Sequence, residues 1–376
     1  MSNKNILIRA IERKKVDKVP MMYRSELAIN EKLIKYFGLK GIDSDWEILI
    51  EMLGADNFSD GETLSAFFNY FPKYIGPEFD AMYEANHFFI WGIKPVEMKI
   101  GDSTEIILHK NPPLECLDDI SDVRNYNFPK MEWFDFDTYK VISDADWKDF
   151  KDQPEIKAEE LQRSDKYFLN TFILNSLFMT SIFMRGFEKM LMDLLTNQKY
   201  AEALIGRIAQ YMIDFHNKNL NSIGDKLDLY GIWDDFATQE ELMISAEVWR
   251  KFYKPWDKKI IEIARKKNLF VSFHVCGNCK EIIPDLIEMG VDILDPVQVS
   301  AKDMDLKGLK KEFGKDICFH GGVDAQKLLV NGTPEKIREE VAEAKKIFDG
   351  DGGIILGPSH YITSDTPIEN ILAIYK

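Results

Sequence analysis

The feature that most constrains this fold lies in the second half of the chain. There, short apolar segments alternate with amphipathic segments of helical period. The apolar segments are rich in β-branched and aromatic residues, as buried strands are. They are 227–233, 269–274, 291–294, 317–320 and 353–356. Helices are expected after them, at about 246–267, 279–289, 306–313, 334–348 and from 368 onward. Strands that alternate with helices at this spacing predict an α/β fold with a parallel sheet.

Polar side chains that are common in active sites follow all five expected strands at their C-terminal ends. In chain order they are Asp234 and Asp235, His274 and Cys276, Asp295 and Gln298, His320 and Asp324, and Ser359 and His360. Barrels of the (β/α)₈ type and open α/β sheets both place their active sites on this face. A closed barrel brings all five ends around one mouth, whereas an open sheet spreads them along an edge. We therefore expect a (β/α)₈ barrel.

The first half of the chain has weaker signals. The expected elements are a leading helix at 5–13, a first barrel strand at 19–23, a strand at 168–173 and a helix at 187–196. Residues from about 55 to 165 are dense in aromatic and charged side chains. Any one of these aromatics is most simply part of the core, but the segment as a whole suggests an insertion over the barrel mouth that lines a substrate pocket. We treat residues 1–376 as one barrel domain that carries this insertion.

Composition limits the classes of partner. The formal net charge of −15 argues against nucleic acid, because phosphate binding needs a basic face. No apolar stretch approaches the length of a membrane span, and no long apolar region follows the N-terminus, so we expect a soluble, cytoplasmic protein. Four cysteines are too few for a disulfide framework, and three of them, Cys276, Cys279 and Cys318, fall within 43 residues. That clustering favours metal or thiol chemistry.

The tripeptide His274-Val275-Cys276 closes one of the expected strands. Residues i and i+2 of a strand point to the same side, so an imidazole and a thiol emerge together where this strand ends. Zinc prefers these two ligand types, and a third ligand from elsewhere would make an open site that activates a thiol, a water or a substrate oxygen. An isolated pair of this kind is more simply a buried thiol beside a hydrogen-bonded histidine. The histidines and acids at the neighbouring strand ends favour zinc.

These motifs, in their order and spacing, resemble the uroporphyrinogen decarboxylase superfamily, and within it the zinc-dependent corrinoid methyltransferases more than the decarboxylases. The matching segments are 233–239, 273–277, 320–324, and 357–360 leading to 365–370. Segments 10–13 and 16–20 also match the opening of the family, and 185–188 matches a middle helix. The resemblance covers nearly the whole chain but is weak from about 40 to 165.

The resemblance implies a distorted (β/α)₈ barrel with one site in its mouth. It further implies a zinc ion held by the His-x-Cys pair and by a third residue before the last helix, which here makes His274, Cys276 and His360 the ligands. Several members of the family have cysteine at the third position, and zinc accepts either residue. A set with more histidine suits activation of an ether or alcohol oxygen better than activation of a thiolate.

Other residues near these motifs have simpler roles open to them. Cys279 could form a C-x-x-C pair with Cys276, but the family pattern gives Cys279 no ligand role. Cys318 lies inside a strand and is expected to be a packed core residue. Asp234 and Asp235 could be charges at a helix N-terminus, or one of them could orient a ligating histidine or protonate a leaving group. For His320 we favour contact with the substrate or with a metal ligand over direct ligation.

The decarboxylases of this fold bind the carboxylates of their tetrapyrrole through an arginine-rich stretch after the first strand. In this chain the corresponding segment, 23–28, keeps one arginine, Arg24, and contains Glu26, which would repel a carboxylate. The His-x-Cys pair is also unnecessary for that metal-free reaction. Uroporphyrinogen decarboxylation is therefore not expected.

The expected function is that of a zinc methyltransferase of one-carbon metabolism, with Asp235 and His320 as catalytic residues. It would move a methyl group between a small methylated compound, such as a methoxy compound undergoing O-demethylation, and the cobalt of a corrinoid, in either direction. The Asp-x-His-x-x-Gly motif that ligates cobalt from below is absent, so a partner protein is expected to carry the corrinoid. Two alternatives remain: a metal-independent decarboxylase or lyase that uses Asp235 as proton donor, and a non-catalytic protein that binds a corrinoid or tetrapyrrole.

Overall fold

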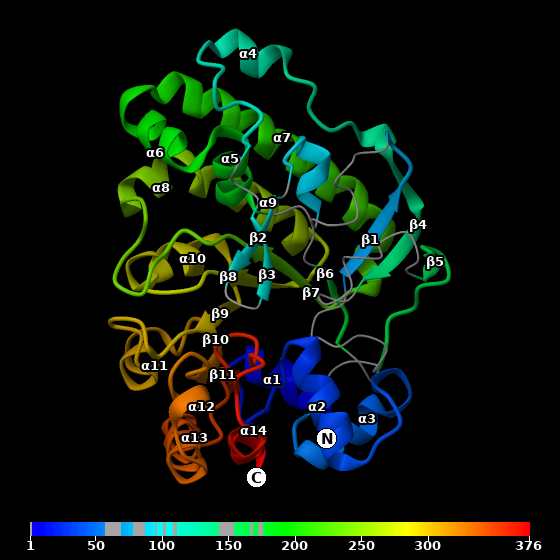
Figure 1. The fold of residues 1–376 in the computed structure, drawn as a ribbon, viewed down its shortest axis with the longest axis vertical. Coiled ribbons are helices and arrows are strands. Elements are labelled where there is room, and N and C mark those ends of the chain that lie inside the picture. The colour runs from blue at the N-terminus through cyan, green and yellow to red at the C-terminus, as the bar shows by residue number, and fades with distance from the viewer. Residues whose placement is uncertain are drawn as a thin grey trace.

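A six-stranded parallel sheet lies at the centre of the computed structural model, which describes residues 2–56, 69–77, 87–94, 96–100, 103–107, 111–142, 154–165, 168–171 and 176–376. Its strands are β6 (Asn170–Thr171), β7 (Leu229–Trp233), β8 (Phe270–His274), β9 (Ile293–Val297), β10 (Cys318–Val323) and β11 (Ile354–Pro358). Their order across the sheet follows the chain, and every neighbouring pair is parallel (Figure 1). The predicted parallel α/β arrangement is confirmed.

Helices connect these strands. They are α5 (Leu177–Arg185), α6 (Phe187–Thr196), α7 (Gln198–Ile223), α8 (Ala246–Phe252), α9 (Lys254–Lys266), α10 (Ile283–Met289), α11 (Leu306–Phe313), α12 (Leu328–Asn331), α13 (Pro334–Phe348) and α14 (Ile368–Tyr375). The helical stretch expected at about 246–267 is confirmed, but it consists of two helices, because the chain breaks at Tyr253 between α8 and α9. Pro255 lies in the first turn of α9, where its missing N–H is harmless, but it could not continue a helix from α8. Among the described residues, no helix is both long and apolar enough to cross a membrane.

The N-terminal segment extends the sheet past β11. After α1 (Asn3–Ile11), the backbone N–H of Leu356 donates to the carbonyl of Pro20 at 2.9 Å, and the N–H of Met22 donates to the carbonyl of Leu356 at 2.8 Å. Isolated parallel bridges join Met21 to Leu356 and Ser25 to Ile362. The expected first strand therefore lies beside β11 in the predicted direction, although it pairs only at single residues. Helices α2 (Leu27–Phe37) and α3 (Ile42–Leu53) follow.

Closure of the barrel is confirmed only in part. At the other edge of the sheet, β6 is followed in space by β1 (Asn69–Tyr74), which contacts it. Over the described ranges, no strand pairing joins this edge to residues 20–25, so the parallel sheet is established and the closed ring is not. The sheet still brings the C-terminal ends of β7 to β11 to one side of the molecule, as the candidate site requires.

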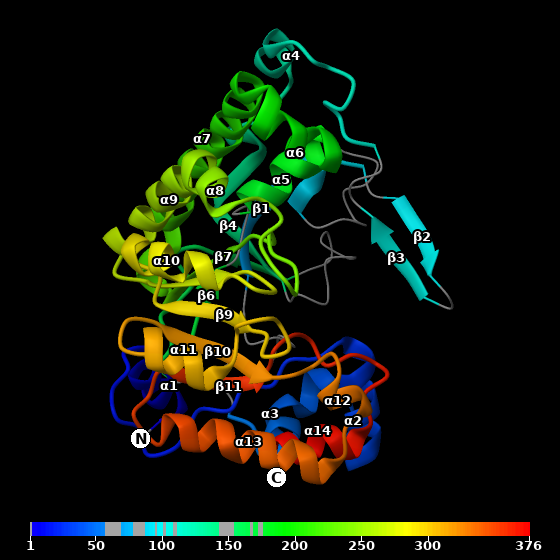
Figure 2. The same cartoon turned by 90° about the vertical axis from the view of Figure 1, so that its left-hand side faces the viewer.

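The expected insertion contains regular structure. Its described parts form an antiparallel sheet of β1, β4 (Phe134–Ile142) and β5 (Glu155–Lys157), a hairpin of β2 (Val96–Ile100) and β3 (Ser103–Ile107), and helix α4 (Ile120–Asn125). Figure 2 shows the hairpin projecting from the body on the side toward which β9 points. That this insertion lines a substrate pocket stays a prediction.

Several aromatics of this segment are core residues. Phe71 and Phe134 are buried and pack against each other and against Phe215 of α7, with ring centroids 5.2 to 6.5 Å apart. Trp91 and Trp133 are buried as well. The simpler interpretation therefore holds for these four side chains, and Phe71 and Phe134 pack the antiparallel sheet against α7. Phe67 and Phe68 lie outside the described residues.

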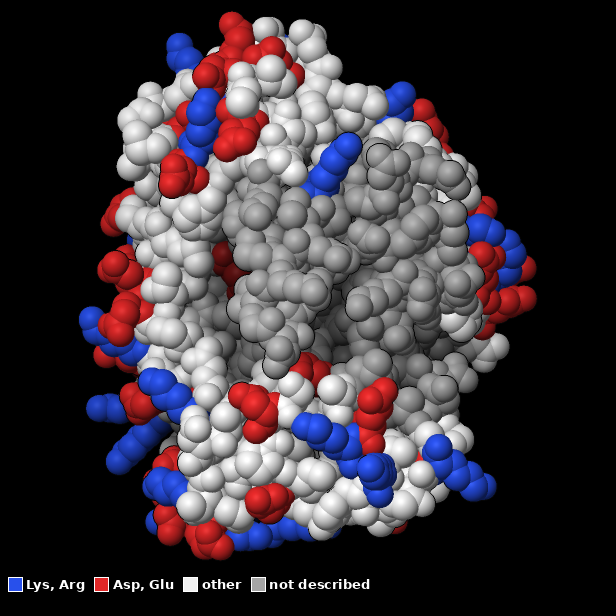
Figure 3. All heavy atoms as spheres, viewed as in Figure 1, with Lys and Arg blue, Asp and Glu red and all other residues white. Residues whose placement is uncertain are grey.

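The surface mixes charges of both signs. Figure 3 shows acidic and basic side chains side by side around the rim of the face seen in Figure 1. A hollow of about 690 Å³ between α11 and α13 is lined mainly by basic residues: Arg13, Lys307, Lys310, Lys311, Lys315 and Lys346. Three of these lysines, Lys310, Lys311 and Lys346, occupy the last turns of the two helices, where a cation stabilises the carbonyl end of a helix. The helix ends thus account for much of this basic patch.

Candidate functional site

Three side chains with metal-binding atoms converge at the C-terminal ends of β7 and β8. One ligand atom from each of Asp235, His274 and Cys276 lies within 4.8 Å of the other two. Sγ of Cys276 is 3.5 Å from Nε2 of His274, and Oδ1 of Asp235 is 3.9 Å from the same nitrogen. His274 is buried, and the other two are half-buried. The structure thus brings the predicted His-x-Cys pair together and adds a carboxylate to it.

The register of the parallel strands explains this convergence. His274 is the last residue of β8, and it pairs with Trp233 on β7 and with Asp295 on β9. The residues that follow β7 and β8 therefore leave the sheet at the same level. The backbone N–H of Cys276 then donates to Oδ1 of Asp235 at 2.9 Å, which fixes the carboxylate beside the thiol.

Asp295 lies behind the cluster and contacts two histidines. Its side chain is almost fully buried; Oδ2 is 2.6 Å from Nδ1 of His274, and Oδ1 is 2.5 Å from Nδ1 of His320. The guanidinium of Arg24 is 3.8 Å from Oδ2. Burial opposes ionisation, but His320 and His274 outweigh it and hold the pKa of Asp295 well below its usual range. The carboxylate that contacts His274 through Nδ1 is therefore Asp295, and neither Asp234 nor Asp235 has that role.

The pKa of His274 lies well above its usual range. Burial lowers the pKa of His274, but the neighbouring Cys276 and Asp295 raise it by more. A raised pKa means that protons compete with a metal ion for this histidine.

Asp234 points away from the cluster and organises a helix. Its buried carboxylate accepts hydrogen bonds from the backbone N–H groups of Phe178 and Met179 at 2.7 and 3.0 Å, and from the hydroxyl of Ser176 at 3.2 Å. These N–H groups belong to the first turn of α5, which has no partner for them within the helix. Burial outweighs the hydrogen bonds and raises the pKa of Asp234 to about 7. The helix N-terminus interpretation thus applies to Asp234, while Asp235 alone faces the metal-binding atoms.

His360 follows β11, and its side chain is exposed. Its nitrogens do not belong to the described group of mutually close donor atoms. Its pKa is lowered to about 4, first by partial burial of the ring and then by the nearby charges of Arg24 and His274. The imidazole is therefore neutral at pH 7, which is the form that binds metals. Its role as third ligand stays a prediction.

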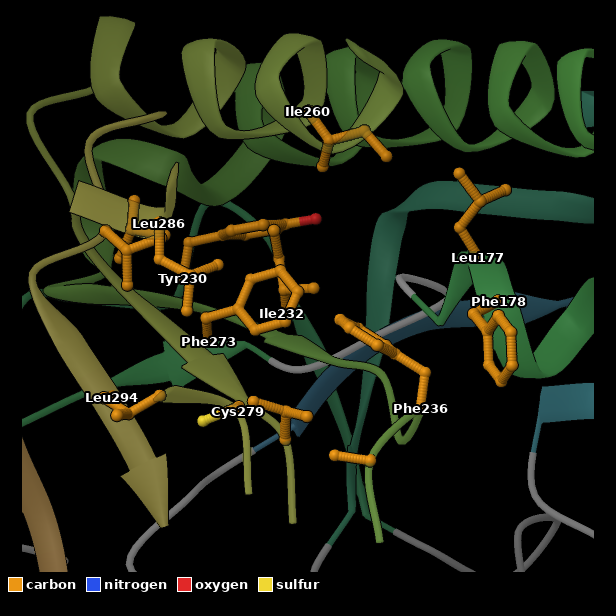
Figure 4. Packing of buried hydrophobic residues seen from close by; sticks show 14 of the residues in the cluster. Leu177, Phe178, Tyr230, Ile232, Phe236, Ile260, Phe273, Cys279, Leu286 and Leu294 are labelled. Atoms are coloured by element: carbon orange, nitrogen blue, oxygen red, sulfur yellow. The ribbon is translucent and has the colours of Figure 1, made fainter. Parts of the chain in front are cut away.

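The other cysteines of the expected cluster are packed away from the site. Cys279 is buried among apolar side chains that include Phe273 and Leu294 (Figure 4). Burial raises the pKa of its thiol to about 12, and burial also raises the pKa of Cys318. A thiol in such surroundings stays protonated and acts as a small apolar side chain, in agreement with the role expected for Cys318.

The remaining polar residues at the strand ends stabilise loops. Asp324 accepts the backbone N–H of Gln326 at 2.9 Å, and the hydroxyl of Ser359 accepts the N–H of Ala325 at 3.3 Å. Gln298 accepts from the side-chain amide of Gln239 at 2.7 Å, which ties the loop after β7 to the end of β9.

Comparison with known proteins places the chain in a family. Residues 166–376, more than half of the chain, match the family model described as uroporphyrinogen decarboxylase (URO-D). The chain belongs to the uroporphyrinogen decarboxylase (URO-D) family. A methylcobamide:CoM methyltransferase, MtbA, of Methanosarcina mazei is 28% identical over 182 residues, which are 48% of this chain and 49% of that protein. A uroporphyrinogen decarboxylase of Chlorobium phaeobacteroides is 22% identical over 177 residues, 46% of this chain and 47% of that protein.

The chain thus spans about half the length of the curated relatives that it matches. A solved structure, described as a methyltransferase from Methanosarcina mazei, superposes with a TM-score of 0.61 at 16% identity. That match covers 100% of this chain and 97% of the other. Similarity at this identity shows the fold alone, and the shared fold extends over the whole chain. The presence of methyltransferases beside decarboxylases among the relatives fits the methyltransferase branch of the family.

Gly277 allows the chain to turn directly after Cys276. Its φ is +99°, and a Cβ atom placed there would lie 2.3 Å from the carbonyl oxygen of Thr238. The N–H of Asn278 donates to the same oxygen at 2.8 Å. The loops after β7 and β8 therefore pack backbone against backbone, which leaves no room for a side chain.

We expect Gly277→Ala to destabilise the protein far more than Gly38→Ala. Both glycines have positive φ, which costs a non-glycine residue about 1–2 kcal/mol, but a Cβ at Gly38 meets nothing within 4 Å. The clash at Gly277 adds about 1–3 kcal/mol, as overpacking does. Denaturant unfolding of both variants measures the difference, and equal losses of stability would contradict the close approach.

Adjacent aspartates should respond differently to truncation. Asp234→Ala leaves two N–H groups of α5 without an acceptor and should cost about 1–3 kcal/mol of unfolding free energy. Asp235→Ala removes a half-exposed carboxylate and should cost less than about 1 kcal/mol. Denaturant unfolding of the two variants compares them under identical conditions. The assignment fails if Asp235→Ala proves the more destabilising change.

Proposed function

We propose that this chain is a zinc-dependent methyltransferase that moves a methyl group between a small methylated compound, such as a methoxy compound, and the cobalt of a corrinoid carried by a partner protein. The observation that carries the proposal is the convergence of a thiol, an imidazole and a carboxylate at Cys276, His274 and Asp235. The relatives named methylcobamide:CoM methyltransferases support it.

The donor set fits zinc. Sulfur, imidazole nitrogen and carboxylate oxygen are its usual protein ligands, and a ligating histidine commonly gives its second nitrogen to a carboxylate, as His274 does to Asp295. We propose His274, Cys276 and His360 as the ligands, with Asp235 beside them. Bound zinc would supply Lewis-acid polarisation of the substrate atom that bears or receives the methyl group.

Asp235 and His320 are the proposed catalytic residues. The carboxylate of Asp235, 3.9 Å from Nε2 of His274, is placed to hold a proton for the leaving atom of the substrate. His320 has its Nδ1 fixed by Asp295, and we assign it a hydrogen bond that orients the substrate. The indole of Trp233, with its ring centroid 6.5 Å from that of His274, gives the site an apolar wall.

The contacts of Arg24 favour methyl transfer over tetrapyrrole decarboxylation. Arg24 is the one arginine left in the segment where the decarboxylases bind carboxylates. Its guanidinium lies 4.2 Å from the ring centroid of Tyr361 and 3.8 Å from Asp295, so it is engaged within the protein. A guanidinium held in this way is poorly available for a substrate with many carboxylates.

Metal analysis tests the proposal. The purified chain should contain about one zinc ion, and Cys276→Ser should lower zinc affinity at least about tenfold while the melting temperature changes little, because the open site is not part of the core. Cys116→Ser, which alters an exposed cysteine, is the matched control and should retain zinc. A zinc-free wild-type chain that remains active would favour the metal-independent lyase.

Turnover should require a corrinoid. With a methylated donor alone the purified chain should show no reaction, and addition of a cob(I)alamin protein, or of free cob(I)alamin at high concentration, should restore methyl transfer. The visible spectrum of the cobalt reports the change directly. Decarboxylation or methyl transfer by the isolated chain would contradict the proposal. Binding of a corrinoid without any turnover would support the non-catalytic alternative.

A further inference from the structure

We propose that Asp295 is a shared positioning residue that fixes the ring hydrogens of His274 and His320 at the same time, and so couples the metal side of the site to its substrate side. The terms metal side and substrate side rest on the proposed function. The hydrogen bonds of Asp295 to the two histidines are independent of it.

The position of Asp295 in the sheet makes the shared contact possible. It lies on β9, between β8, which ends at His274, and β10, which carries His320. Each carboxylate oxygen contacts a different ring: Oδ2 is 2.6 Å from Nδ1 of His274, and Oδ1 is 2.5 Å from Nδ1 of His320. Rotation of the carboxylate to favour one histidine would lengthen its contact with the other.

An ionised carboxylate can only accept hydrogen bonds. Nδ1 of both histidines must therefore carry a hydrogen, and in a neutral ring the lone pair is then on Nε2. For His274 this is the nitrogen that faces Cys276 and Asp235, so the contact selects the ring form that can bind a metal. The nearby guanidinium of Arg24 favours the ionised carboxylate.

Asp295→Asn separates this role from simple space filling. Asparagine keeps the shape of the side chain but has one accepting oxygen and one donating NH₂ group. The oxygen can serve one histidine, and the NH₂ group must then face Nδ1 of the other. That second histidine has to give up its Nδ1 hydrogen. The variant is therefore expected to change one of the two rings, and a change at His274 puts the hydrogen on the metal-binding nitrogen.

Nitrogen-15 NMR of histidine-labelled protein measures the ring hydrogens directly, and the chain has only six histidines. Comparison with His274→Gln and His320→Gln assigns the two signals. In the wild type both Nδ1 atoms should carry hydrogen, and in Asp295→Asn one of them should lose it. If either histidine lacks the Nδ1 hydrogen in the wild type, the proposal is overturned, whatever the Asp295→Asn variant shows.

Asp292→Asn is the matched control. It makes the same change three residues earlier, at a carboxylate that accepts the N–H of Val271 at 2.8 Å and pairs with Arg265 at 2.6 Å. This variant should leave both histidine signals unchanged. A shift of equal size in Asp292→Asn would mean that the effect reflects general disturbance of β9, and it would overturn the specific role of Asp295.

Zinc affinity, measured by competition with a chromophoric chelator, gives the second readout. Asp295→Asn should weaken binding about 10–100-fold when the change falls on His274, as loss of such a carboxylate partner does. Asp292→Asn should bind zinc as the wild type does. Equal zinc affinity with both Nδ1 hydrogens retained in Asp295→Asn would overturn this role but leave the proposed function intact. If the wild type does not bind zinc, the proposed function is contradicted. The NMR result would still decide the role of Asp295.

Discussion

The candidate site depends on the alignment of neighbouring parallel strands. Trp233, His274 and Asp295 occupy matching positions on β7, β8 and β9. The chain leaves β7 and β8 at this level, whereas β9 continues to Val297. This register places Asp235 beside Cys276 and sets the buried carboxylate of Asp295 against the back of His274. The apolar packing in Figure 4, with Phe236, Phe178 and Phe273 around the ends of β7 and β8, holds these loops in place.

Much of this arrangement could be predicted from the sequence, because it depends on local patterns. The strands of the second half are apolar runs that end at polar residues, and strand alternation predicts that His274 and Cys276 emerge together. The structure ends β8 at His274, so Cys276 takes its place from the loop that follows. The division of roles between Asp234 and Asp235 could not be predicted in the same way. Which of two successive carboxylates faces the site depends on α5, whose first turn takes Asp234, and on Cys276, whose N–H takes Asp235.

Long-range pairing explains the remaining differences. Phe71 and Phe134 are core residues, as the simpler interpretation expects, but the partners against which they pack depend on the pairing of β1 with β4, which no local pattern encodes. The sequence marks Asp295 as a polar residue at a strand end, but its contact with two histidines requires β8, β9 and β10 to be adjacent in the sheet. The relatives include both methyltransferases and decarboxylases, and our proposal of methyl transfer rests on the His-x-Cys pair and on the internal contacts of Arg24.

The most direct test of the account is X-ray absorption spectroscopy at the zinc edge of the zinc-loaded chain. It reports the atoms bound to the metal without reference to any substrate or partner. We expect one sulfur ligand at about 2.3 Å, from Cys276, and nitrogen or oxygen ligands at about 2.0–2.2 Å, with the sulfur signal absent in Cys276→Ser. Zinc that is bound only through nitrogen and oxygen in the wild type, or a sulfur signal that survives in the variant, would contradict it.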